Sequence, residues 1–177
     1  MKENLLQLEI TTDRLILRPV SMADRDSIFR EFTPEITRFM MPLFAERIED
    51  TDKFINDSRQ KMANGEEVTC AIFDKSNGEF LGTGGIHRIN TPTPELGIWL
   101  KKSAHGHRYG REAVAGFKKW ADENLVYEYI LYPVFKENVP SRKIAESLGG
   151  KLIGESEKKN GAGVIMTSLE YRIYRTG

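Results

Sequence analysis

The stretch SAHGHRYGREA combines residue types that can bind an anion. Gly106 and Gly110 allow the backbone to approach a ligand closely, and His107, Arg108 and Arg111 offer positive charge and donors for phosphate oxygens. An apolar stretch, LGIWL, precedes it and an amphipathic one, AVAGFKKWADENL, follows, which predicts a strand leading into a helix. Because the first N–H groups of a helix lack partners, such turns are typical of phosphate sites. A basic surface loop with a glycine bend is the alternative interpretation.

Three other side chains are candidates for proton transfer. His87 lies in GGIHRI, and histidine as a residue type suits proton transfer near neutral pH. Glu95 opens the strand ELGIWL, and either residue can serve as a general base. Ser141, near the start of a short predicted helix, is a candidate proton donor. Each also has an ordinary interpretation, as a packed or exposed strand histidine, a strand-edge carboxylate and a helix-start residue. Glu112 is interpreted as a first-turn charge that complements the helix dipole.

The composition sets limits on the class of protein. The chain has 177 residues, with 26 basic and 26 acidic side chains, so no overall positive charge is present to hold a nucleic acid or an anionic membrane. Cys70 is the single cysteine, which excludes an internal disulfide and fits a buried small residue in a reducing compartment. No apolar run approaches membrane length. We therefore expect a cytoplasmic protein. A bound metal is not expected, and the sequence leaves open whether the protein is a monomer or a homodimer.

Hydrophobic periodicity predicts one α+β domain over residues 1–177. Meander strands come first and strand–helix–strand units follow, which favours a mixed, mostly antiparallel sheet with helices on both faces. Asn77-Gly78 within KSNG marks a hairpin, and Asn138 lies at the N-cap position of a short helix. The expected strands are 14–20, 67–74, 79–89, 95–102, 127–135, 151–158 and 164–175, and the expected helices are 21–32, 49–65, 109–125 and 138–148.

The segments ELGIWLKKSAHGHRYGREAVAGFKKWADENL and KENVPSRKIAESLGGKLIG resemble the GCN5-related N-acetyltransferase (GNAT) superfamily. The start, ITTDRLILRPVSMADRDSIFREF, resembles its RimJ/RimL-like branch, which acetylates ribosomal-protein N-termini. The resemblance implies the acyl-CoA N-acyltransferase fold, with acetyl-CoA as cosubstrate and its pyrophosphate on the glycine-bearing loop. An amine, either a small molecule or a protein N-terminus, would accept the acetyl group.

The family signature Q/R-x-x-G-x-G/A maps to His105, Arg108 and Gly110, of which only Gly110 agrees. Arg108 replaces the usual glycine, either redirecting the loop or adding a cation for the pyrophosphate. The resemblance also implies that the backbone of the preceding strand pairs with the pantetheine arm and that an asparagine contacts the CoA arm. The residues expected to bind the cosubstrate are Leu100, Lys102, His107, Arg108, Tyr109, Gly110, Arg111 and Asn138.

Acetyl transfer needs a neutral amine and a polarised thioester carbonyl. An α-amino group with a pKa near 8 is ~10–20% neutral at neutral pH, whereas neutralising a lysine costs about 4 kcal/mol, so an N-terminal amine needs only a modest base. The tyrosine acid common in the family is replaced by Ala145, which motivates an alternative: a CoA-binding regulatory or vestigial domain without transferase activity. The Met- and aromatic-rich stretch 31–44 is expected near the acceptor, with packed core as the other interpretation.

Overall fold

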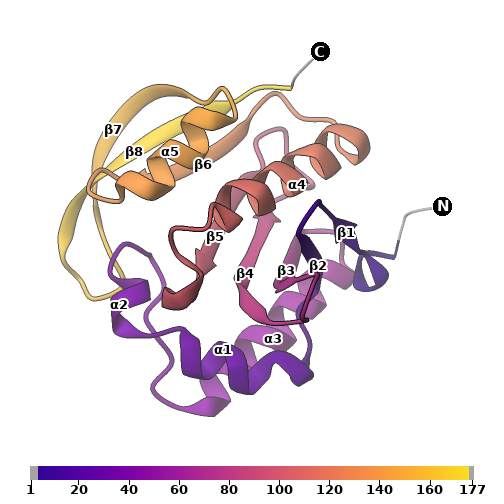
Figure 1. Ribbon diagram of the computed structural model, residues 1–177. Coiled ribbons are helices and arrows are strands. Elements are labelled where there is room, and N and C mark those ends of the chain that lie inside the picture. Colours follow the sequence, from indigo (N-terminus) through magenta and orange to yellow (C-terminus); the bar gives the residue numbers. More distant parts are fainter. Residues whose placement is uncertain (1–3, 176–177) are drawn as a thin grey trace.

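The computed structural model describes residues 4–175; residues 1–3 and 176–177, which the single-domain prediction includes, lie outside the described residues. All its strands join one sheet in the order β1-β2-β3-β4-β5-β6-β8-β7 (Figure 1). The strands are β1 (Ile10–Thr11), β2 (Leu15–Pro19), β3 (Glu67–Asp74), β4 (Phe80–His87), β5 (Glu95–Leu100), β6 (Ile130–Phe135), β7 (Lys151–Lys159) and β8 (Ile165–Ile173).

Neighbouring strands are antiparallel except for β5 and β6, which are parallel. These two strands pair at one position only, Glu95 with Leu131, near the start of each. Beyond that pair they separate, and the sheet opens between their C-terminal ends. The predicted mixed, mostly antiparallel sheet is therefore confirmed, and its single parallel pair produces the opening on which the site depends.

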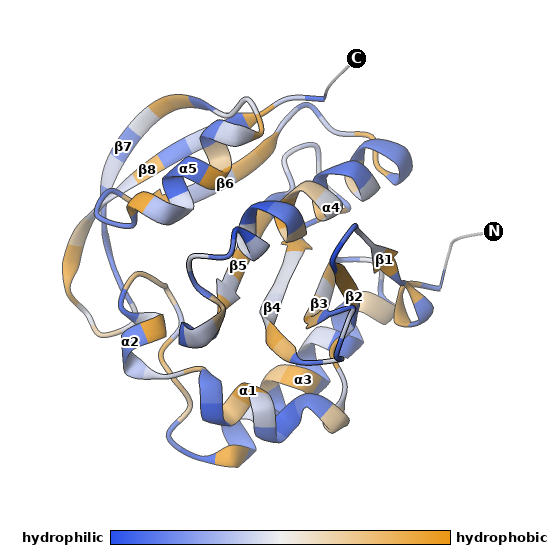
Figure 2. Cartoon of the chain, in the orientation of Figure 1, coloured by the Kyte–Doolittle hydropathy of each residue, from blue (hydrophilic) through white to orange (hydrophobic). Residues whose placement is uncertain are grey.

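Helices cover both faces of the sheet, as predicted. They are α1 (Arg25–Glu31), α2 (Pro34–Thr37), α3 (Ile48–Ala63), α4 (Tyr109–Asn124) and α5 (Val139–Ser147). α1 and α3 pack on one face through Ile28 and Ile55, which meet Trp99 of β5. α4 and α5 lie on the other face (Figure 1). α5 carries both hydrophilic and hydrophobic residues, as expected for a helix with one side on a sheet (Figure 2).

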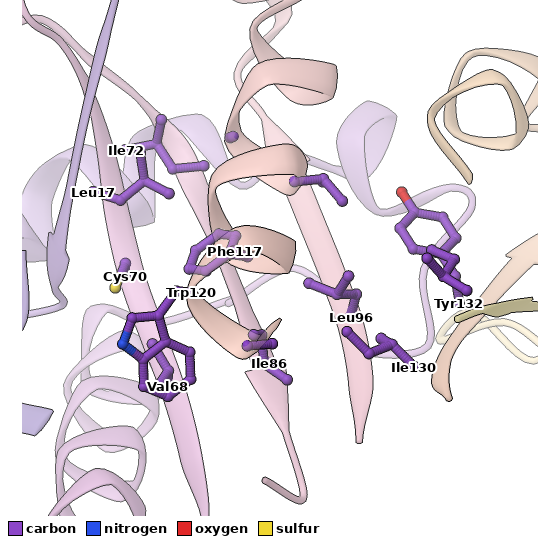
Figure 3. Close-up of a cluster of buried hydrophobic side chains, with 14 of the residues drawn as sticks. Leu17, Val68, Cys70, Ile72, Ile86, Leu96, Phe117, Trp120, Ile130 and Tyr132 are labelled. Carbon is purple, nitrogen blue, oxygen red and sulfur yellow. The ribbon is translucent and has the colours of Figure 1, made fainter. Parts of the chain in front are cut away.

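The larger core lies between α4 and the sheet. Phe117 and Trp120 project from α4 toward the strand residues Cys70, Ile86 and Leu96 (Figure 3). Cys70 is fully buried, and burial raises the pKa of its thiol far above the ordinary value. The interpretation of this cysteine as a small hydrophobic core residue is confirmed.

Some element boundaries differ from the predictions. The short strand β1 and the helix α2 were not anticipated; α2 forms because the Thr33 side chain accepts a hydrogen bond from the Ile36 N–H and Pro34 starts the helix. β5 ends at Leu100 rather than at Lys102, since Lys102–Ala104 form a 3-10 turn. β6 begins at Ile130, three residues later than predicted.

Candidate active site

The floor of the candidate site is the face of β3, β4 and β5 that looks toward α1 and α3. Side chains alternate across a sheet, so the register places residues from the three strands in rows on this face. The middle row has only a threonine and two glycines, and the resulting hollow forms because these residues have little or no side chain. The rows are Glu67–His87–Glu95, Thr69–Gly85–Gly97 and Ala71–Thr83–Trp99.

The gap between β5 and β6 exposes unpaired backbone of β5. The Lys101 N–H donates to the Leu81 carbonyl at 2.8 Å, so alternation along an antiparallel ladder directs the backbone of Ile98 and Leu100 away from β4. β6 no longer pairs with β5 at Ile98 and Leu100, because Glu95 is the one β5 residue that pairs with β6. The carbonyl of Leu100 accepts from His105 Nε2 at 2.9 Å. The N–H groups of Ile98 and Leu100 and the Ile98 carbonyl therefore face the opening.

A cavity of about 950 Å³ occupies this opening and reaches both faces of the sheet. On one side it is lined by residues from α1, α3 and the segment between α2 and α3. On the other it reaches β6 and the start of α5. Representative lining residues are Phe32, Phe39, Phe44 and Phe54 on the first side, and Val134, Asn138 and Ser141 on the second.

The turn between β7 and β8 holds the apolar wall of this cavity in place. The buried Asn160 donates from Nδ2 to the Arg38 carbonyl at 2.9 Å, and the Gly161 N–H donates to the Met40 carbonyl at 2.9 Å. A Cβ at Gly161 would lie 2.7 Å from the Met41 carbonyl oxygen, so only glycine allows this approach. Residues 39–44 line the cavity, and Phe32, Ile36 and Met40 of the predicted stretch 31–44 also pack against the core; that the cavity receives an acceptor stays a prediction.

The stretch that the sequence predicts to bind an anion, residues 103–113, leads into the first turn of α4 and is called the anion loop below. Gly106 has φ +83° and Arg108 has φ 63° and ψ 14°, so the arginine adopts the left-handed conformation that a glycine would adopt more easily. Arg108 and Arg111 are exposed, and neither forms an ion pair within residues 4–175. Gly110 lies inside the helix instead of at a positive φ; its missing side chain accommodates Ile144 of α5.

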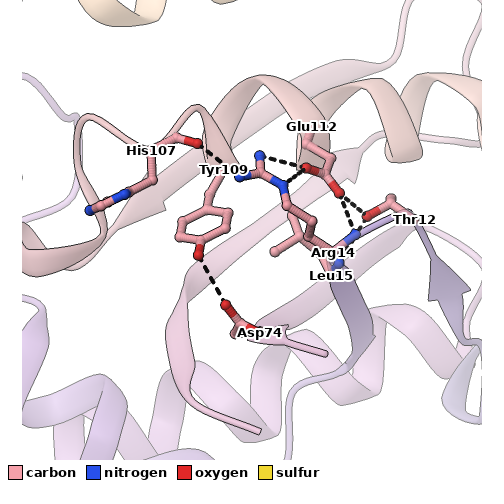
Figure 4. A network of polar contacts seen from close by, with 7 residues as sticks. All are labelled: Thr12, Arg14, Leu15, Asp74, His107, Tyr109 and Glu112. Atoms are coloured by element: carbon pink, nitrogen blue, oxygen red, sulfur yellow. Dashed lines mark hydrogen bonds and ion pairs between the residues drawn. The ribbon is translucent and has the colours of Figure 1, made fainter. Parts of the chain in front are cut away.

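A polar network fixes the back of this loop to β2 and β3 (Figure 4). Arg14 pairs with Glu112 at 2.7 Å and donates to the His107 carbonyl at 3.2 Å, and its guanidinium lies 4.7 Å from the centre of the Tyr109 ring. The Tyr109 hydroxyl donates to Asp74 at 2.9 Å. The side chains of Tyr109 and Glu112 thus support the loop from behind, while the N–H groups at the start of α4 remain available.

The two candidate bases have different surroundings. Nδ1 of His87 lies 3.1 Å from Oε2 of the buried Glu67, and its Nε2 lies 3.7 Å from the position of a Cβ on Gly97, over the cavity floor. Oε2 of Glu95 accepts from Arg88 at 3.0 Å in a partly exposed ion pair. Both His87 and Glu95 line the cavity, and Nε2 of His87 has no hydrogen-bond partner among residues 4–175.

Ser141 and Asn138 border the cavity on the α5 side. The Asn138 side chain accepts from the Ser141 N–H at 3.3 Å, which confirms its capping role. The Ser141 hydroxyl lies 3.0 Å from that of Tyr132, a buried residue of β6. Burial raises the pKa of Tyr132 to about 12, although the Ser141 contact lowers it. This pair brings hydroxyl groups to the side of the opening opposite His87.

Sequence reasoning did not identify Glu67, Ile98 and Tyr132. Ile98 could have been found from strand alternation alone, since it is two residues before Leu100 in β5. Glu67 and Tyr132 carry no local signal, because their contacts depend on strand register and on the packing of α5. Within residues 4–175, no cluster of three metal-ligating side chains occurs. The helices of this described part are too short or too polar to cross a membrane.

Comparison with known families agrees with this geometry. A family model described as the acetyltransferase (GNAT) domain matches residues 14–151. The chain belongs to this family, as its sequence resemblance implied. The search of curated proteins found no match.

Solved structures share the fold at low sequence identity. RimL, described as a ribosomal L7/L12 alpha-N-protein acetyltransferase in complex with coenzyme A, superimposes with a TM-score of 0.84 at 15% identity, covering 96% of this chain and 100% of that one. An acetyltransferase of the GNAT family from Bacillus anthracis has a TM-score of 0.82 at 18% identity, over 95% and 99%. The microcin C7 self-immunity acetyltransferase MccE, in complex with acetyl-CoA and AMP, has a TM-score of 0.81 at 18% identity, over 92% and 93%.

Proposed function

We propose that this protein transfers the acetyl group of acetyl-CoA to a primary amine, which is either a protein N-terminal α-amine or a small amine. The main support for this proposal is the cavity that passes through the opening between β5 and β6. It connects the unpaired backbone of β5 to an apolar pocket that His87 lines. The two substrates would enter from opposite faces of the sheet. Complexes of RimL with coenzyme A and of MccE with acetyl-CoA support the choice of cosubstrate.

The residues present fit acetyl-CoA. The backbone of Ile98 and Leu100 offers hydrogen bonds to the amide groups of a pantetheine arm, which consists of alternating donors and acceptors. The first turn of α4, with Arg108 and Arg111, offers N–H groups and positive charge to a pyrophosphate. Lys102 pairs with Glu35 of α2 and contributes charge at the rim rather than strand backbone.

The chain's own contribution to the reaction is orientation and proton transfer. Nε2 of His87 accepts a proton from the ammonium form of the acceptor, so that the nitrogen lone pair becomes available. That lone pair forms the new C–N bond, the C–S bond breaks, and its electron pair leaves on sulfur. The nitrogen then gives up the second proton that an amide does not keep, and the thiolate takes one proton. Ser141 is the proposed relay on the α5 side: its hydroxyl passes a proton to sulfur and takes one in return. A backbone N–H of β5 is the proposed donor that polarises the thioester carbonyl.

The proposal is tested by titrating the protein with acetyl-CoA and CoA in a calorimeter and then measuring CoA release with a panel of amines. We expect micromolar binding and faster release with N-terminal peptides or apolar amines than with lysine side chains, because less free energy is needed to neutralise an α-amine. Binding without release by any amine would instead support a CoA-binding regulatory domain. Absence of binding would contradict the proposal.

Replacing Arg108 by glycine tests the anion loop. We expect CoA to bind about tenfold more weakly, because one charge-assisted contact worth roughly 1.5 kcal/mol is lost. The free energy of unfolding should change by less than about 1 kcal/mol, since relief of the left-handed strain offsets the greater freedom of glycine in the unfolded chain. Arg88→Gly is the matched control, because Arg88 also has a positive φ (56°) but lies outside the loop. Equal or tighter CoA binding by Arg108→Gly would show that Arg108 does not bind phosphate.

A further inference from the structure

We infer that Glu67 is a positioning residue for His87: its carboxylate accepts the Nδ1 proton and thereby directs the unprotonated Nε2 into the acceptor side of the cavity. This inference rests on the proposed function for its catalytic consequence, but the positioning itself can be measured without turnover. The positioning of His87 involves neither the anion loop nor the β5 backbone groups that are proposed to bind acetyl-CoA.

The geometry places the carboxylate directly beside the imidazole. Glu67 and His87 are cross-strand partners on β3 and β4, with Oε2 and Nδ1 3.1 Å apart. Glu67 is 5% exposed, so water does not compete strongly for its carboxylate oxygens. Its second oxygen, Oε1, accepts from the Thr69 hydroxyl at 2.9 Å, and Lys61 of α3 lies 3.6 Å from Oε2. The carboxylate is therefore held by three groups from three elements, β3, β4 and α3.

An ionised carboxylate has only acceptor atoms, which determines the tautomer of its partner. Burial acts to raise the pKa of Glu67, but the hydrogen bond from His87, the positive charge of that ring when protonated, the hydrogen bond from Thr69 and the charge of Lys61 outweigh it, and the net pKa is below the ordinary value. Glu67 is thus ionised at neutral pH. Nδ1 of His87 must then carry the proton, which leaves the lone pair of the neutral ring on Nε2.

The surroundings of Nε2 complete the argument. This atom lies over Gly97, where the missing side chain leaves the approach open. The ring itself is 42% exposed and lines the cavity, so without a partner on Nδ1 it would be able to rotate. The neighbouring Glu95, which is the cross-strand partner of His87 on β5, is engaged by Arg88 and does not replace Glu67.

The direct test is the tautomer of His87, read from nitrogen-15 correlation spectra of the full chain. With three histidines, the His87 signals are assigned by their loss in His87→Gln. At a pH about two units above the ordinary histidine pKa of about 6.5, we expect the Nδ1–H form in the unmodified protein. In Glu67→Leu, which removes the acceptor at similar size, we expect the Nε2–H form, the major form of a free neutral histidine side chain. Glu66→Leu is the matched control and should leave the tautomer unchanged.

Kinetics supply the second readout. In Glu67→Leu we expect kcat to fall about 10- to 100-fold while the KM for acetyl-CoA stays within about twofold, and Glu67→Gln, which keeps an acceptor oxygen, should recover part of the loss. An Nε2–H tautomer in the unmodified protein, or an unchanged tautomer and kcat in Glu67→Leu, would overturn the inference. If no amine is acetylated, the proposed function fails, whereas the tautomer result still decides the positioning role. Should Glu67→Leu not fold, the same spectra of Glu67→Gln and the unmodified protein decide it.

Discussion

Replacing His87 by glutamine is expected to lower kcat about 100- to 1,000-fold at neutral pH, while the KM for acetyl-CoA changes little. Glutamine has a similar size and polarity but cannot accept a proton at this pH, and loss of a positioned general base has effects of this order. The loss of kcat should shrink as the pH rises toward the pKa of the acceptor, about 8 for an α-amine, because a larger fraction of the amine is then already neutral in solution. Steady-state rates across this pH range measure both effects.

Glu95→Gln is the comparison that distinguishes the two candidate bases. Its carboxylate is paired with Arg88, so we expect less than a tenfold loss of kcat. A larger loss for Glu95→Gln than for His87→Gln would assign the base to Glu95 instead. Denaturant unfolding of both variants shows whether either change reflects the fold, since His87 is partly exposed and its replacement should cost little stability.

The second large effect is on stability: Phe117→Ala is expected to reduce the free energy of unfolding by about 3–5 kcal/mol. The ring is fully buried between α4 and the sheet. Its Cε2 atom lies 3.0 Å from the position of a Cβ on Gly84, so the ring rests directly on the backbone of β4. Alanine would leave a cavity beneath the helix whose first turn forms the anion loop. Urea unfolding should show a lower midpoint at an unchanged m-value.

Lys119→Ala is the control for this prediction, because it makes the same change to alanine two residues further along α4. Its side chain is 77% exposed and forms only a surface ion pair with Glu123, so the free energy of unfolding should change by less than about 0.5 kcal/mol. A loss below about 1 kcal/mol for Phe117→Ala would show that α4 does not pack on the sheet as described.

Local patterns in the sequence determined much of this fold. The periodicity of Val114, Phe117 and Ala121 specified a helix with one buried side, and α4 begins where predicted, at Tyr109. Asn138 caps α5 as its residue type indicates, because a side-chain oxygen there satisfies an N–H group at the helix start. These features depend on neighbours within a few residues, which is why sequence reasoning recovers them.

The anion loop shows where local reasoning is incomplete. The sequence identified its cations, but not that Arg108 itself adopts a left-handed conformation, which glycine adopts more easily. That conformation costs an ordinary residue roughly 1–2 kcal/mol and persists only because surrounding contacts hold the loop. Those contacts come from Arg14 and Asp74, which are remote in the sequence and reach the loop only when the sheet forms.

What the sequence alone determined, therefore, is most of the elements, without β1 and α2, the cap of α5 and the candidates for chemistry, including His87. Tertiary structure decided which carboxylate accompanies His87. Next to the turn, Phe73 pairs with Phe80, and that register continued along the hairpin would place Glu66 opposite His87. Leu81 is an extra residue in β4 that shifts the pairing by one, so Glu67 takes that place and lies on the cavity face. A bulge depends on how the whole sheet twists and packs, and the sequence of one hairpin does not specify it.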